Sequence, residues 1–244
     1  MVSFAILSVV PVPDLALARR HHQLDDLDDE SVAKVLFHRR KQSSGGIESL
    51  RWDQCAIGAV SLIGQTPEQL TVSRWTAGEP DETAMLQAVQ TLAANRTHLL
   101  SWSTQQAVLP LLRSRAVMHG CTIPSLWSDG PAPAWTDLGD WWAADTQDRP
   151  DIDAIASAIG LPGLSPLTQD SAMEAWIKGD ARAVEVLATL QALNLYLMAL
   201  RLLLARGECD QKQIDHAHEK LSAWLEVQQD PSLQTFHRRW RGAD

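Results

Sequence analysis

The chain has 244 residues, of which 45% are apolar and 21% are charged, and its net charge is −9 at pH 7. This composition is typical of a soluble globular protein with a full core and excludes a disordered or fibrous chain. The acidic balance also disfavours a broad nucleic-acid surface, because phosphate binding relies on clustered Lys and Arg.

Three features bear on the compartment. Cys55, Cys121 and Cys209 are odd in number, far apart and without metal-ligand spacing, so we expect reduced thiols and a cytoplasmic protein. The apolar residues 1–12 have no basic segment before them and are predicted to be a strand rather than a signal peptide. The apolar run 187–204 is interrupted by polar residues, and we expect a core helix rather than a membrane span.

The hydrophobic pattern along the chain predicts an α/β protein with a mixed sheet. Pro11 and Pro13 are expected to end the first strand, and Ser31 to begin a helix within the first helical region. Strands are predicted at residues 4–10, 55–63, 70–75, 98–102 and 125–127. Helices are predicted within 15–41 and at 81–94, 107–120, 153–159, 172–178, 181–206 and 210–227.

Residues 98–120 form the most informative stretch, a short buried strand that leads through a polar turn into a helix. Such turns lie at the carboxyl edge of a sheet, where open α/β folds place their sites. This turn carries no reactive side chain, since no Asp, Glu, Cys or His lies between Ser101 and Met118.

The same stretch resembles the second motif of the predicted 3′-5′ exonucleases related to the proofreading domain of family B DNA polymerases, through Ser101-Trp102 and Leu109-Pro110-Leu111-Leu112. Further matches follow in order: Pro13-Asp14, Phe37-His-Arg-Arg-Lys41, Trp135-Thr-Asp-Leu138, Gly160-Leu-Pro-Gly163 and Asn194 to Arg201. The resemblance implies a ribonuclease-H-like fold, with a mixed five-stranded sheet flanked by helices and a helical C-terminal portion. It implies one domain over residues 1–244, with a helical insert at about 15–45 and a helical extension at about 208–244.

The resemblance also implies that the family's chemistry is lost. The family holds two divalent cations with four carboxylates, and a Tyr orients the attacking water. These positions fall on Ser8, Val10, Val108 and Gln191, with the Tyr at Leu187. No shift of register restores a carboxylate, because residues 1–13, 83–128 and 186–207 contain no Asp or Glu.

We therefore expect a pseudo-exonuclease, a binding or scaffold protein without a metal or other cofactor. One alternative is a 3′-5′ exonuclease or other nucleic-acid-processing enzyme with a relocated metal site, using Asp14, Asp137 or the histidines. The other is a non-hydrolytic nucleic-acid-binding protein. Asp137 is equally well explained as the cap of the helix that contains Trp141.

The candidate binding residues are tryptophans and a basic run. The chain has ten tryptophans, and aromatic side chains are enriched at protein interfaces. We expect a protein partner or a second copy of the chain, weak or absent nucleic-acid binding, and no membrane association. The candidate contacts are Trp135, Trp141, Trp142, Arg39, Arg40 and Lys41.

Overall fold

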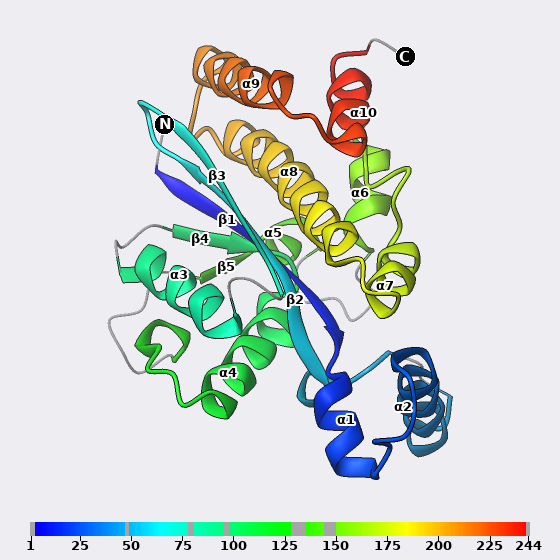
Figure 1. Ribbon diagram of the computed structural model, residues 1–244. Helices are drawn as coiled ribbons and strands as arrows, with labels where there is room; N and C mark the ends of the chain where they lie inside the picture. The colour runs from blue at the N-terminus through cyan, green and yellow to red at the C-terminus, as the bar shows by residue number, and fades with distance from the viewer. Residues whose placement is uncertain are drawn as a thin grey trace.

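The structure, a computed structural model, describes residues 3–46, 49–77, 81–94, 98–127, 135–143 and 150–242. Its centre is a five-stranded sheet in the order β3-β2-β1-β4-β5 (Figure 1). The strands are β1 (Phe4–Pro13), β2 (Cys55–Gln65), β3 (Leu70–Thr76), β4 (His98–Ser101) and β5 (Trp135–Asp137). The first three strands are antiparallel, whereas β4 runs parallel to β1 and β5 parallel to β4. The predicted mixed α/β sheet is confirmed.

Strand β1 separates two hydrophobic cores because successive side chains point to opposite faces of the sheet. Phe4, Ile6 and Val10 join the core on the face covered by α8 (Ala181–Ala205). Ala5 and Leu7 join the core on the face covered by α3 (Glu82–Ala94) and α4 (Leu109–Met118). Figure 1 shows α8 on one side of the strands and α3 and α4 on the other.

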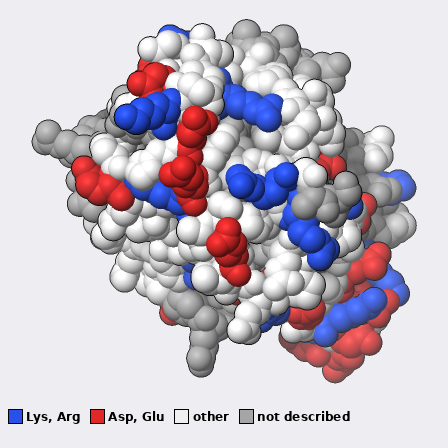
Figure 2. All heavy atoms as spheres, turned by 90° about the horizontal axis from the view of Figure 1, so that it is seen from above, with Lys and Arg blue, Asp and Glu red and all other residues white. Residues whose placement is uncertain are grey.

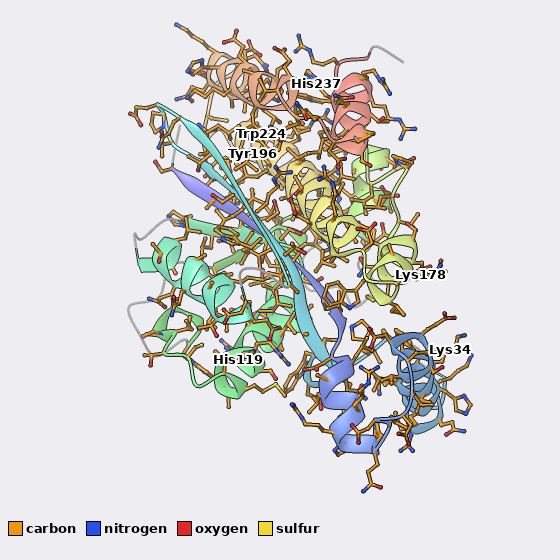
Figure 3. The ribbon with its side chains drawn as sticks, in the orientation of Figure 1. Lys34, His119, Lys178, Tyr196, Trp224 and His237 are labelled. Atoms are coloured by element: carbon orange, nitrogen blue, oxygen red, sulfur yellow. The ribbon has the colours of Figure 1, made fainter. Side chains whose placement is uncertain are left out.

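Helix α8 is the central helix of the C-terminal half. By length and composition alone it could cross a membrane, but 83% of its most apolar window is buried inside the protein. Near its middle, Tyr196 lies between α8 and the strands (Figure 3), and its hydroxyl donates a hydrogen bond to Gln65 Oε1 at 2.6 Å. The prediction of a core helix is confirmed.

Helices α6 (Ile152–Ala158), α7 (Gln169–Ile177), α9 (Gln211–Glu226) and α10 (Pro231–Trp240) surround α8. Helix α10 was not predicted from the sequence pattern; its Leu233 and Phe236 are buried in the α8 core. Helices α1 (Leu15–His22) and α2 (Asp29–Ser44) form a separate pair beyond the end of β1, with a small cluster of their own (Figure 1).

Two strand predictions were wrong. Strand β1 does not end at Pro11 but continues to Pro13. Its register with β2 shifts between Val10 and Pro11, and its pairing with β4 covers only Phe4–Ile6. Because the pairing with β4 ends at Ile6, Pro11 and Pro13 lie where one side of β1 is an edge, and an edge tolerates the missing N–H of proline. The predicted strand at 125–127 is instead a 3₁₀ turn, η3 (Pro124–Leu126), and the fifth strand is β5.

Candidate functional site at the β1–α8 crossing

The resemblance places the family's four metal ligands and its Tyr at five positions of this chain. Two of these positions are in direct contact in the structure, although they are 183 residues apart in the sequence. Ser8 lies on β1 and Gln191 on α8, and the Ser8 hydroxyl donates a hydrogen bond to Gln191 Oε1 at 2.9 Å. Leu187 lies one helical turn before Gln191, on the same face of α8. Leu187 and Val10 are fully packed into the core on this side of the sheet.

The contact between Ser8 and Gln191 contains no charged atom. Gln191 Nε2 in turn donates to Gln169 Oε1 at 3.4 Å, so the polar chain continues into the first turn of α7. Ser8 is buried and Gln191 is half-buried. Ser8, Gln191 and Gln169 therefore form a chain of neutral hydrogen-bonding groups beside the core.

A pocket of about 550 Å³ opens beside this pair. Its wall combines Trp102 and Ser103 at the end of β4 with the starts of α6 and α7 and with Gln191. Among the described residues that line it, three are aspartates (Asp151, Asp153 and Asp170) and none is basic. These carboxylates are not among the site residues predicted from the sequence. Their sequence signal is their place at helix starts, where Asp is a common cap.

Two of the three aspartates have structural roles. Asp151 Oδ1 accepts from the backbone N–H of Ala154 at 2.6 Å and caps α6. Asp153 Oδ1 accepts from the backbone N–H of Leu164 at 2.7 Å. The turn before Leu164 includes Gly163, whose φ is +69° and where an added Cβ would collide with Asp153.

The same turn is tied to α8. Asn194 is fully buried; its Oδ1 accepts from the Gly163 N–H at 3.1 Å and its Nδ2 donates to the Gly163 carbonyl at 2.9 Å. Two segments that show the family resemblance, the Gly-Leu-Pro-Gly turn and the helix with Asn194, are therefore joined by two hydrogen bonds.

Val108 lies on the opposite face of the sheet from Ser8 and Gln191. It ends a π-helix, η2 (Thr104–Val108), and packs in the core formed with α3 and α4. It also lines a second pocket with Val9 and Cys55. Burial raises the pKa of the Cys55 thiol to about 12, so this neighbourhood disfavours negative charge.

Asp137 clamps the turn between β4 and η2. Its carboxylate accepts from the backbone N–H groups of Ser103 at 3.1 Å and Thr104 at 2.7 Å, and from Gly139 at the start of α5 (Leu138–Ala143) at 2.8 Å. Of the two explanations left open for this residue, the structure supports the capping one.

Ser103 has a left-handed backbone conformation with φ of 54°, which glycine adopts freely and most L-residues adopt only at a cost. We expect Ser103→Gly to raise the free energy of unfolding by about 0.5–1 kcal/mol. Chemical denaturation measures the change, and Ser103→Ala, which keeps the Cβ, should give no gain. A stabilised alanine variant would show that backbone strain is not the cause.

The candidate binding residues do not form one surface. Trp135 packs against the α3–α4 core and donates from Nε1 to the Ser125 carbonyl at 3.0 Å. Trp141 packs against the α8 core under the Arg206 guanidinium, and Trp142 is exposed. Arg39, Arg40 and Lys41 all lie on α2, beyond the end of β1. Arg39 contacts His22 at 3.2 Å, and Arg40 donates to the Ser49 carbonyl at 2.9 Å.

The residues considered for a relocated metal site are also separated. Asp14 Oδ1 caps α1 at Leu17, while its Oδ2 pairs with Arg115 at 2.6 Å. Within the described ranges, no group of three or more His, Cys, Asp or Glu is placed to hold a metal ion.

The chain is similar to a known protein family. A family model described as "Predicted 3'-5' exonuclease related to the exonuclease domain of PolB" matches residues 48–240. The matched region contains Val108, Leu187 and Gln191 and begins after β1. No curated protein matches the chain.

Proposed function

The chain belongs to the family of predicted 3′-5′ exonucleases related to the exonuclease domain of PolB, and from this premise we propose that it is a catalytically inactive member. In this proposal the protein acts as a binding or scaffold module, chiefly for a protein partner, and uses no metal or other cofactor.

The observation that carries the proposal is the hydrogen bond between Ser8 and Gln191. A site for two divalent cations needs several carboxylates, whose charge balances the ions and whose oxygens fix their separation. Here the crossing of β1 and α8 is occupied by a neutral hydroxyl and a neutral amide that satisfy each other. Asp151 and Asp153 line the adjoining pocket, and one carboxylate oxygen of each already accepts a hydrogen bond from a backbone N–H.

Charge supports a protein partner over nucleic acid. The net charge is −9, and on the face seen in Figure 2 acidic and basic side chains are interspersed without a wide basic area. Counterion release from phosphates requires such an area. All three cysteines are free, which supports a place in a reducing, cytoplasmic compartment.

We expect the purified protein to leave 5′-labelled single-stranded and double-stranded DNA and RNA intact with either Mg²⁺ or Mn²⁺, even at molar excess over substrate. Gel electrophoresis of the products checks this, and calorimetric titration with Mn²⁺ should show no tight binding. Binding to labelled single-stranded DNA at near-physiological salt should be weaker than about 10 μM, within the range of non-specific contacts.

The variants Asp153→Asn and Asp170→Asn separate true activity from contamination. Metal-dependent trimming from the 3′ end that disappears in either variant would belong to this chain and would contradict the proposal. Sub-micromolar DNA affinity that falls steeply with salt would contradict the choice of a protein partner.

A further inference from the structure

Exposed apolar side chains gather around one groove, which lies away from the β1–α8 crossing. Of seven large apolar side chains that are exposed in the described part of the chain, four line this groove. Trp52 comes from the 3₁₀ turn η1 (Trp52–Gln54), Val117 and Met118 from the end of α4, and Trp127 follows η3. Helix α4, to the left of α1 in Figure 1, also contributes Pro110 and Ser114 to the lining.

The remaining lining residue is Arg113, the only charged side chain among the described residues of the groove. Its Nε donates to the Leu126 carbonyl at 2.6 Å, and its guanidinium lies over the Trp127 ring, 5.4 Å from the centroid. These contacts fix the side chain in place but supply no carboxylate. In an acidic protein, a fixed arginine without an acidic partner in the described part of the chain leaves a local positive charge among apolar groups.

The composition of the groove matches the centre of a protein interface. Trp, Met and Arg are enriched at such surfaces, and Trp and Arg dominate the binding energy there. Stacking on Trp127 holds the Arg113 guanidinium in place, so less side-chain freedom is lost when a carboxylate binds to it.

We propose that this groove, here called the α4 groove (Trp52, Pro110, Arg113, Ser114, Val117, Met118 and Trp127), docks an apolar peptide segment that carries a carboxylate. Apolar side chains of the segment lie between Trp52 and Trp127, and the carboxylate pairs with Arg113. This inference rests on the proposed function in that it specifies the surface and the chemistry of the protein partner.

Two synthetic amphipathic helical peptides test the proposal by fluorescence anisotropy. They share the same leucine and phenylalanine positions, and one carries glutamates where the other carries lysines. We expect the glutamate peptide to bind at least tenfold more tightly. The net charge of −9 favours the lysine peptide non-specifically, so the expected order reports the local charge of Arg113.

Variants of the protein locate the binding. Val117→Glu, at a side chain 71% exposed, should weaken binding of the glutamate peptide at least tenfold. Val227→Glu is the matched control, because Val227 is 73% exposed and lies outside the groove. Arg113→Glu should reverse the preference between the two peptides, and unchanged thermal unfolding of each variant excludes misfolding.

Equal binding of the two peptides, no binding of either, or an equal loss in Val227→Glu would overturn the proposal. Self-association that Val117→Glu abolishes would overturn it in favour of a second copy of the chain. Because these variants lie away from Ser8 and Gln191, nuclease activity would contradict the proposed function alone, whereas failure of the peptide test would contradict the groove alone.

Discussion

Arg115→Met should lower the free energy of unfolding by about 3–5 kcal/mol, because it removes one partner of a buried ion cluster. The Arg115 side chain is 8% exposed and joins α4 to two carboxylates that are each 10% exposed. Its Nη1 pairs with Asp14 Oδ2 at 2.6 Å, and its Nε donates to Glu82 Oε2 at 2.8 Å. Without the guanidinium, both carboxylates would stay buried without the arginine that pairs with them.

The cluster connects α1, β2, α3 and α4, which explains why we expect a large loss of unfolding free energy. Glu82 Oε1 accepts from the Ile57 N–H on β2 at 2.5 Å, and Glu82 Oε2 contacts His119 at 2.5 Å, at the end of α4 (Figure 3). Burial by itself lowers the pKa of Arg115, but the hydrogen bonds with Glu82 and Asp14 raise it above its usual value. The guanidinium is therefore charged throughout the pH range in which the protein folds.

Denaturant unfolding at neutral pH measures the loss. Arg51→Met is the matched control, since Arg51 pairs with Asp53 at 2.7 Å on the surface, where ion pairs contribute about 0–1 kcal/mol. The triple variant Arg115→Met, Asp14→Asn, Glu82→Gln should recover part of the stability, because it removes the stranded charges. An Arg115→Met protein as stable as the Arg51→Met protein would show that the cluster is solvated.

Val108→Asp should lower the free energy of unfolding by about 3 kcal/mol at pH 7. The substitution removes a valine from the α3–α4 core and buries a carboxylate at a position only 7% exposed. Val117→Asp, in the following helix at an exposed position, is the control and should cost less than about 0.5 kcal/mol.

The cost of Val108→Asp should depend on pH in a defined direction. Burial raises the folded-state pKa of the new carboxyl above its unfolded value of about 3.9. The folded state therefore binds the proton more tightly, so the difference from the native protein is largest at neutral pH and shrinks as the pH falls through the folded pKa. Unfolding titrations at pH 7 and pH 4.5 check the sign.

Mn²⁺ should not rescue the Val108→Asp protein. The new carboxylate lies on the opposite face of the sheet from Ser8 and Gln191. A melting temperature raised by Mn²⁺ in the variant but not in the native protein would show that Val108 shares a site with the β1–α8 crossing.

Much of the fold followed from local patterns, because those patterns record burial on one face of an element. The continuous apolar runs of β1 and β2, the 3.6-residue spacing in α3 and the nearly all-apolar α8 each identify an element before its neighbours are known. The patterns were weakest where an element is short. Strand β5 has three residues and is a strand only because it pairs with β4.

The sequence alone determined the absence of carboxylates from residues 1–13, 83–128 and 186–207, since that statement needs no coordinates. Only the tertiary structure decided how the remaining groups meet. It joined Ser8 to Gln191, turned Val108 to the other face, buried Arg115 between Asp14 and Glu82, and gathered Trp52, Val117 and Trp127 around one groove. Each of these depends on contacts between residues far apart in the chain, and such contacts are set by the packing of whole elements rather than by local residue preference.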